Sequence, residues 1–169
     1  MLKLYVIYIT MGFEIITVSE KWNESIKKFY RESNERMGVS RKFTDFVLKA
    51  DLLNPYETYT QLNHQMFLCI DDNQSLIGMV CVKPSEGKDN LEVSRLSVHP
   101  NFRRQGIARK LMEHCFQLGP TVLSCMEKNE EAIKFYQSIP QIIEDKRETR
   151  WSNTDQLYYT LVYYKTERD

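Results

Sequence analysis

The sequence predicts one α/β domain, spanning residues 1–169, with a mixed but mostly antiparallel sheet of six or seven strands and about four flanking helices. A chain of 169 residues is long enough for one domain with a sizeable core and too short to expect two. Apolar residues make up 42% of the chain and aromatic residues 12%, as in globular proteins. Short apolar runs bounded by turn residues occur among stretches whose apolar residues recur every three or four positions, so strands and helices share the chain.

The first elements are predicted from the N-terminal segment. Residues 4–9 are apolar but too few to span a membrane, and no small-residue cleavage site follows them, so residues 1–10 are predicted to be an N-terminal extension or an extra strand. Residues 13–18 are mostly apolar and β-branched, which predicts the first core strand. Ser19 is predicted to cap a helix over residues 20–34. The inner face of this helix is predicted to consist of Trp22, Ile26, Phe29 and Tyr30.

Two further helices are predicted before the sheet continues. A break at residues 37–40 separates the first helix from a second one over residues 41–49. The inward side chains of the second helix are predicted to be Phe43, Phe46 and Val47. Asn54-Pro55 begins a turn, and a short helix is predicted over residues 56–62.

A β-hairpin is predicted next. Residues 66–70 and 76–82 are two apolar runs, and residues 71–75 between them have the sequence Asp-Asp-Asn-Gln-Ser, which favours a turn. We expect the two strands to pair antiparallel beside the strand that follows.

The central strand is predicted over residues 91–98. Its apolar residues are Leu91, Val93, Leu96 and Val98. It ends near His99 because the residue before a proline is restricted to extended or turn geometry. The next residues, 103–108, have the pattern R-x-x-G-x-A and lead into a helix that closes at Gly119-Pro120. One face of this helix is predicted to consist of Ile107, Leu111, Cys115 and Leu118.

The R-x-x-G-x-A turn has the chemistry of an anion site. A helix that starts in a glycine turn presents unpaired backbone N–H groups and the positive end of its dipole, which suit a phosphate or pyrophosphate. Gly106 lets a ligand approach the backbone, and Arg103 and Arg104 add positive charge. The pattern alone also fits a solvated basic helix start, or a contact to the phosphate backbone of a nucleic acid.

The C-terminal third is predicted to complete the sheet. Residues 122–126 form a short strand, and Asn129 caps a helix whose first turn carries Glu130 and Glu131. One face of this helix carries Ala132, Ile133 and Tyr136. The last two strands are predicted over residues 141–143 and 157–164, and the charged residues 145–153 between them are predicted to form a loop over the site.

This order of strand, R-x-x-G-x-A turn, helix, strand and Asn129 resembles the GNAT superfamily of acyl-CoA-dependent N-acetyltransferases, from about residue 66 to residue 136. The resemblance implies that the pyrophosphate of coenzyme A binds at Arg103, Arg104, Gln105, Gly106, Ile107 and Ala108. It also implies that the pantetheine arm pairs with the backbone of Leu96 and Val98 where two strands splay apart, and that Asn129 and Ala132 contact the cofactor. Pro140-Gln141 stands where family members often have Gly-Phe, so the turn into the next strand is expected to differ.

The resemblance also implies roles in catalysis. Glu92, which lies 11 positions before Arg103, is the candidate base for the incoming ammonium, and Tyr136 is the candidate acid for the departing thiolate. A backbone N–H near Val98 is the candidate oxyanion donor, and attack is expected to be direct, with no acetyl-enzyme. On simpler interpretations, Glu92 is an exposed strand residue paired with a lysine, Tyr136 packs its helix on the sheet, and Asn129 only caps.

The sequence therefore predicts a cytoplasmic N-acetyltransferase, monomeric or homodimeric, that uses acetyl-CoA as co-substrate and a small-molecule or protein amine as acceptor. The alternative is a non-catalytic acyl-CoA-binding or sensing module. With 23 basic and 23 acidic residues, nucleic-acid and membrane binding through bulk charge are disfavoured. No metal is expected, because the three histidines lack ligand spacing, and the four cysteines are expected to be reduced and buried. The acceptor is expected to bind between residues 35–41 and 145–153.

Overall fold

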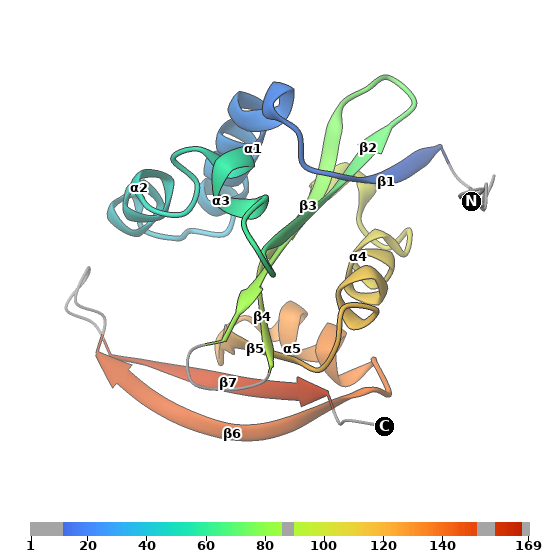
Figure 1. The fold of residues 1–169 in the computed structure, drawn as a ribbon. Coiled ribbons are helices and arrows are strands. Elements are labelled where there is room, and N and C mark those ends of the chain that lie inside the picture. The colour runs from blue at the N-terminus through green and yellow to red at the C-terminus, as the bar shows by residue number, and fades with distance from the viewer. Residues whose placement is uncertain (1–11, 86–89, 152–157, 167–169) are drawn as a thin grey trace.

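The computed structural model describes residues 12–85, 90–151 and 158–166 of the chain (Figure 1). The extension or extra strand predicted for residues 1–10 lies outside these residues. The structure confirms a mixed α/β fold, with a seven-stranded sheet in the order β1-β2-β3-β4-β5-β7-β6. The strands are β1 (Phe13–Thr17), β2 (Gln65–Asp71), β3 (Leu76–Pro84), β4 (Leu91–Val98), β5 (Thr121–Met126), β6 (Ile142–Trp151) and β7 (Tyr158–Thr166). The β4–β5 pair is parallel, and the other neighbours pair antiparallel.

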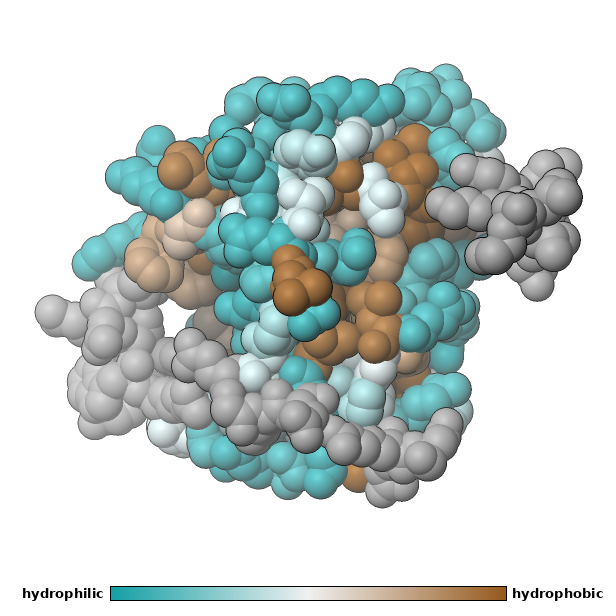
Figure 2. Space-filling model, in the orientation of Figure 1, coloured by the Kyte–Doolittle hydropathy of each residue, from teal (hydrophilic) through white to brown (hydrophobic). Residues whose placement is uncertain are grey.

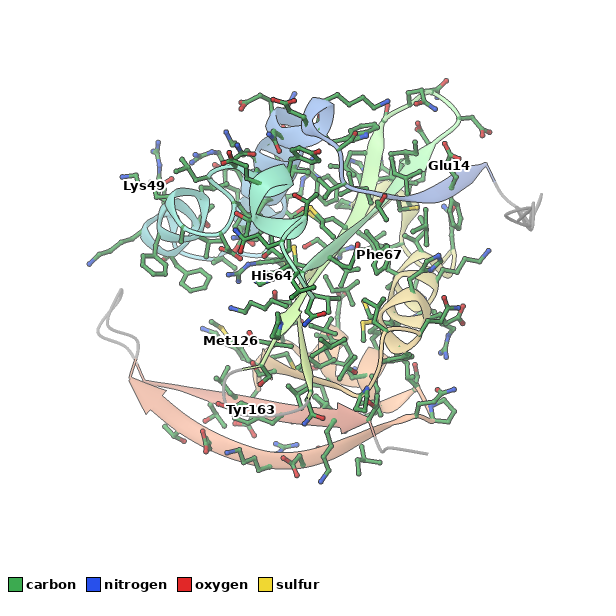
Figure 3. The ribbon with its side chains drawn as sticks, viewed as in Figure 1. Glu14, Lys49, His64, Phe67, Met126 and Tyr163 are labelled. Carbon is green, nitrogen blue, oxygen red and sulfur yellow. The ribbon has the colours of Figure 1, made fainter. Side chains whose placement is uncertain are left out.

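Helices cover both faces of the sheet. The helices α1 (Asn23–Arg36), α2 (Arg41–Lys49) and α3 (Pro55–Tyr59) lie on one face, and α4 (Ile107–Phe116) and α5 (Glu130–Gln137) lie on the other (Figure 1). Side chains that alternate along β2 supply the two cores: Phe67 and Cys69 pack in the core with α4, whereas Met66 and Leu68 pack in the core with α1. Figure 3 shows Phe67 on the α4 side, where its ring contacts the ring of His114. The strands therefore separate two cores.

The start of the first helix differs from the prediction. Ser19 makes no side-chain cap bond among the described residues; instead, its carbonyl accepts a hydrogen bond from the backbone N–H of Trp22. This three-residue spacing produces a 3-10 helix, η1 (Glu20–Trp22), and α1 begins only at Asn23. The predicted inner face is confirmed, because the side chains of Trp22, Ile26, Phe29 and Tyr30 are all buried.

The second helix has the predicted bounds but a different inner face. Ser40 caps α2 by accepting a hydrogen bond from the Phe43 backbone N–H at 3.2 Å. Phe46, predicted to face inward, is 60% exposed. The buried face follows the spacing of three and four residues, and it consists of Thr44, Val47 and Leu48. Helix α3 ends at Tyr59, three residues before the predicted end, and Leu62 is exposed.

The predicted hairpin and central strand are confirmed. The Asp71 carboxylate accepts hydrogen bonds from the backbone N–H groups of Asn73 and Ser75, which fixes the turn between β2 and β3. A 3-10 helix, η2 (Pro100–Phe102), follows β4. Helix α4 packs closely on β3, since a Cβ at Gly78 would lie 3.1 Å from the Ile107 Cγ2 atom.

The predicted face of α4 is confirmed except at its end. Ile107, Leu111 and Cys115 are buried, but Leu118 is 43% exposed. The helix ends at Phe116, so Leu118 lies beyond its last turn and does not share its inner face. Met112, which the sequence analysis did not place on this face, is fully buried instead.

The largest correction concerns residues 145–153, which were predicted to form a loop over the site. Within the described part of this segment, β6 continues to Trp151 and pairs with β7 along its whole length. The strand lies at the edge of the sheet, where charged side chains are tolerated because they remain in water. Ion pairs link Glu144 with Arg147 and Lys146 with Glu148. A charged sequence therefore forms an edge strand here.

Candidate cofactor cleft and active site

The strands β4 and β5 separate soon after they meet. They pair only at Leu91 with Thr121 and at Glu92 with Val122, although β4 continues to Val98 and β5 to Met126. The side of β4 that faces β5 consequently has no strand partner beyond Glu92 among the described strands. Backbone N–H and C=O groups on such a free edge can pair with an extended amide chain. We call this opening the β4–β5 gap.

Helix α4 begins beside the open end of this gap. Gly106 occupies its N-cap with a φ of 81°, a left-handed conformation that glycine adopts at no steric cost. No side chain of the described residues caps the helix, and apart from the adjacent residues and the backbone of the helix itself no described heavy atom lies within 4 Å of the position of a Cβ at Gly106. The first turn carries no acidic residue. The start of α4 thus presents accessible N–H donors and uncompensated positive potential to an anion.

Arg103 connects the segments around the open end of the gap. Its Nε donates a hydrogen bond to the Val98 carbonyl at 3.4 Å, and its Nη1 lies 3.2 Å from Glu131 Oε2 at the start of α5. Arg104 has a φ of 64°, and Gln105 donates from its side chain to the Asn101 carbonyl. Arg103 therefore joins the end of β4 and the start of α5 to the turn before α4.

The start of α5 is occupied by its own side chains. The Asn129 Oδ1 accepts a hydrogen bond from the Ala132 backbone N–H at 3.2 Å, which is the capping interaction expected from the sequence. Glu130 and Glu131 in the first turn compensate the helix dipole. Asn129 and Ala132, which were predicted to contact the cofactor, bond to each other in this structure.

Glu92 lies at the last paired position of β4, where the gap begins. Its Oε1 lies 3.9 Å from Lys83 Nζ on β3, and both side chains are about half exposed. This is the pairing with a lysine that is expected if Glu92 has only a structural role. An exposed pair of this length constrains a carboxylate weakly.

Tyr136 lies in the core of the α4–α5 face. Its ring lies 5.3 Å from that of Tyr164 on β7, and burial raises the pKa of its hydroxyl, which therefore stays protonated at neutral pH. Tyr164 was not singled out in the sequence. Its buried hydroxyl has no hydrogen-bond partner among the described residues. The alternation of Val162 and Tyr164 along β7 is the pattern that could have predicted its inward position.

The cysteines are free thiols. Burial raises the pKa of Cys69, Cys81 and Cys115 to about 12, and that of Cys125 to about 11. Cys125 is only partly buried, in contrast to the prediction, and packs at the margin of the core with α4 and α5. Within residues 12–85, 90–151 and 158–166, no group of three or more His, Cys, Asp or Glu side chains could hold a metal ion. No helix in that part of the chain is long and apolar enough to cross a membrane.

A mixed sheet that opens beside a glycine-started helix, with helices on both faces, is a fold that this chain shares with solved acetyltransferases. The chain belongs to the acetyltransferase (GNAT) family, whose sequence profile matches residues 23–139. No curated protein sequence matches it significantly.

Several solved structures share its fold. A GNAT-family acetyltransferase from Staphylococcus aureus Mu50 is 19% identical, with a TM-score of 0.71 over 92% of this chain and 100% of that one. The ribosomal-protein-S5-alanine acetyltransferase from Vibrio fischeri is 13% identical, with a TM-score of 0.73 over 96% of each chain. Arabidopsis thaliana NAA60, solved with a bisubstrate analogue, is 15% identical, with a TM-score of 0.70 over 90% of this chain and 96% of that one. At these identities the likeness concerns the fold.

Proposed function

We propose that the protein is an N-acetyltransferase that moves an acetyl group from acetyl-CoA to a primary amine by direct attack in a ternary complex. The observation that carries this proposal is the β4–β5 gap, which opens onto the uncapped, glycine-started helix α4. A free strand edge suits the amides of a pantetheine arm, and the helix start suits a pyrophosphate. Family membership supports the same activity.

In this proposal residues 103–108 bind the pyrophosphate and the backbone of Leu96 and Val98 binds the pantetheine arm. Arg103 donates a hydrogen bond to the Val98 carbonyl and pairs with the Glu131 carboxylate. A ligand that enters the gap would reach both of these contacts. A diphosphate is a stronger partner for a guanidinium than one exposed carboxylate, because it offers more charge and bidentate geometry. Asn129 and Ala132 flank the ligand from α5.

Two side chains handle the protons. Glu92, directly or through a water, takes a proton from the ammonium, and the free amine attacks the thioester carbonyl to form the C–N bond. As the C–S bond breaks, the Tyr136 hydroxyl donates to the departing sulfur, and a backbone N–H near Val98 stabilises the oxyanion. In total the amine loses two protons, the thiolate gains one, and one reaches solvent. The raised pKa values of the four thiols leave no ready thiolate for a covalent route.

The acceptor is an amine of a small molecule or of a protein. Among proteins of similar fold, one is named for acetylating an alanine of ribosomal protein S5 and another for acetylating nourseothricin, so both acceptor classes occur on this fold. We further propose that the protein acts in the cytoplasm as a monomer or homodimer, with neither nucleic acid nor membrane as partner. Residues 35–41 and the charged strand β6 are the proposed walls of the acceptor site.

Coenzyme A release, followed with a thiol reagent over a panel of amines, tests the activity. The Glu92→Gln variant keeps the shape of the side chain but removes its basicity, so turnover at pH 7 should fall by about two orders of magnitude and recover partly towards pH 10 as free amine accumulates. Lys83→Gln is the matched control, because it breaks the same ion pair and leaves the carboxylate. Tyr136→Phe should also slow turnover, with little change in acetyl-CoA affinity.

Three outcomes would contradict parts of the proposal. A wild-type protein that binds acetyl-CoA by calorimetry but releases no coenzyme A with any amine would be a binding or sensing module. A Glu92→Gln protein with the wild-type rate and pH profile would exclude Glu92 as base. Activity lost on replacing one cysteine, with an unchanged melting temperature, would indicate an acetyl-enzyme instead.

A further inference from the structure

We propose that Asp51 and Arg95 are positioning residues, which hold a bulge of β4 in the one conformation that directs its backbone N–H groups at the acetyl carbonyl. This inference rests on the proposed function and adds to it two residues outside the cleft described above. Neither stood out in the sequence, because a charged residue in a strand and an aspartate after a helix both have ordinary exposed roles.

The bulge lies between the candidate base and the residues that would bind pantetheine. On β3, Met79 pairs with Ser97 and Cys81 pairs with Ser94, so Arg95 and Leu96 together lie opposite one residue of β3. Arg95 has a φ of 58°, in the left-handed region that a long side chain rarely occupies. Such a conformation persists where surrounding contacts impose it, and it is often found at functional sites.

The side chain of Arg95 provides those contacts. Its Nη2 lies 3.3 Å from Asp51 Oδ2 and 3.4 Å from Oδ1, and Asp51 Oδ2 also accepts a hydrogen bond from the Tyr59 hydroxyl at 2.7 Å. The guanidinium lies over the ring of Tyr30, 5.8 Å from its centroid. The side chains of Arg95 and Asp51 are only 23% and 21% exposed. Strand β4 is thus tied to α1, to α3 and to the segment between α2 and α3.

The composition of this cluster favours a positioning role. The Arg95 Nε is buried and has no hydrogen-bond partner among the described residues, so the pair is only partly satisfied. A largely buried, partly satisfied ion pair is weak evidence for stability, since apolar side chains of similar volume often stabilise as well. Compared with apolar packing, an ion pair adds a fixed orientation, because the N–H donors of the guanidinium must point at the carboxylate oxygens.

Strand β4 needs such an anchor because its other edge is free. Beyond Glu92 it has no described strand partner on the side of β5, so backbone hydrogen bonds hold it from β3 alone. The bulge sets both the direction of the N–H groups near Val98 and their distance from Glu92. A displacement of about 1 Å in a reacting geometry costs on the order of a hundredfold in rate.

The test compares two ion pairs. Asp51→Asn keeps the size of the side chain and an oxygen for Tyr59, and it removes the charge that holds Arg95. Glu24→Gln is the control, because it breaks a shorter pair, Lys27 to Glu24 at 2.8 Å, that lies within α1 and does not involve β4. We expect Asp51→Asn to lower kcat about tenfold or more, with the KM for acetyl-CoA changed less than about twofold. Exchange of the backbone amides of residues 95–98 should accelerate about tenfold. The control should change neither quantity.

Arg95→Gly separates positioning from backbone strain. Glycine adopts a φ of 58° readily, so this variant relieves the strain while it removes the anchor. A purely structural role predicts a folded variant with wild-type kcat, whereas the proposal predicts the same loss of kcat as Asp51→Asn. The double variant should be no slower than either single one, because both break one interaction.

Wild-type kcat and wild-type exchange at residues 95–98 in folded Asp51→Asn and Arg95→Gly proteins would overturn the inference. If the wild-type protein releases no coenzyme A, the proposed function fails separately. The exchange measurement then still shows whether the pair holds the bulge, because it does not depend on turnover.

Discussion

The two helices beside the β4–β5 gap begin in opposite ways. Helix α4 starts at a left-handed glycine, without a side-chain cap among the described residues and without an acidic residue in its first turn. Helix α5 starts at Asn129, whose side chain caps it, and carries Glu130 and Glu131 in its first turn. At both starts the first backbone N–H groups have no acceptor within the helix, and both lie at the positive end of a helix dipole.

The difference shows that the N–H groups and the dipole at a helix start can stabilise one helix and bind a ligand at another. At α5 the protein supplies its own acceptors and carboxylates, so the helix start is satisfied. At α4 no described side chain supplies such an acceptor or charge, so the N–H groups and the dipole remain available to a ligand. Arg103 lies between them and pairs with Glu131. The contrast predicts that changes at α4 act on cofactor affinity, whereas changes at α5 act first on stability.

The largest effect is expected from Gly106→Glu. A carboxylate at the start of α4 would repel a pyrophosphate, and such juxtaposition of like charges costs several kcal/mol, so acetyl-CoA affinity should fall by about two orders of magnitude or more. Gly38→Glu is the matched control, because Gly38 also has a positive φ, of 68°, and no described atom near its Cβ position, but lies between α1 and α2. Calorimetry on both folded variants decides the point, and unchanged affinity in Gly106→Glu would remove the anion site at α4.

A smaller loss is expected from Arg103→Gln. It removes a charge-assisted hydrogen bond to the pyrophosphate, and such a bond contributes about 1.5–3 kcal/mol, so affinity should fall by about one to two orders of magnitude and depend less on salt. Arg109→Gln, on α4, is the control, since Arg109 bonds to Ser138. Equal affinities for the two variants would show that Arg103 serves only to join β4 with α5.

Asn129→Ala should act mainly on stability. Loss of the N-cap should lower the free energy of unfolding by about 1 kcal/mol, as measured by urea denaturation. Asn129→Ser retains a capping oxygen and should restore most of that stability. If Asn129→Ser is stable but binds acetyl-CoA poorly, the amide also contacts the ligand, as the family resemblance implies, and the two helix starts differ less than we infer.

The smallest effect is expected from Glu131→Gln. It releases Arg103 from an exposed ion pair, and because such pairs contribute little, acetyl-CoA affinity should rise only about twofold. Glu130→Gln removes the same charge from the same turn but breaks a pair with Lys134, so it corrects for the general change in potential. Affinity that falls in Glu131→Gln but not in Glu130→Gln would mean that Glu131 orients Arg103 for the ligand.

Strong periodicity made much of this fold predictable. Strand β4, helix α2 and the β2–β3 hairpin have nearly the predicted bounds, because alternating apolar residues and turn chemistry are local signals. The glycine turn at Gly106 was equally local. Phe46 was misplaced because apolar character alone does not say which side of a helix faces a core, whereas Leu118 was misplaced because α4 ends before it, at Phe116.

Features that depend on distant partners were not predictable. Strand β6 is charged throughout its middle, and only its pairing with β7 makes it a strand. Arg95 and Asp51 are 44 positions apart and carry no pattern that connects them. The candidate cofactor residues follow from the family resemblance, whereas the burial of Tyr136 against Tyr164 required the structure.

Because β4 and β5 pair at only two positions, the sheet is mechanically divided between these strands. Every other neighbouring pair of strands shares five or more registered positions. Side chains from α4, α5 and β7 pack across this seam, so dispersion and burial, rather than a ladder of hydrogen bonds, join the two halves. A pantetheine arm lying in the gap would add the hydrogen bonds that β4 and β5 do not make to each other. The co-substrate would then act as a temporary strand, and each release of coenzyme A would reopen the sheet.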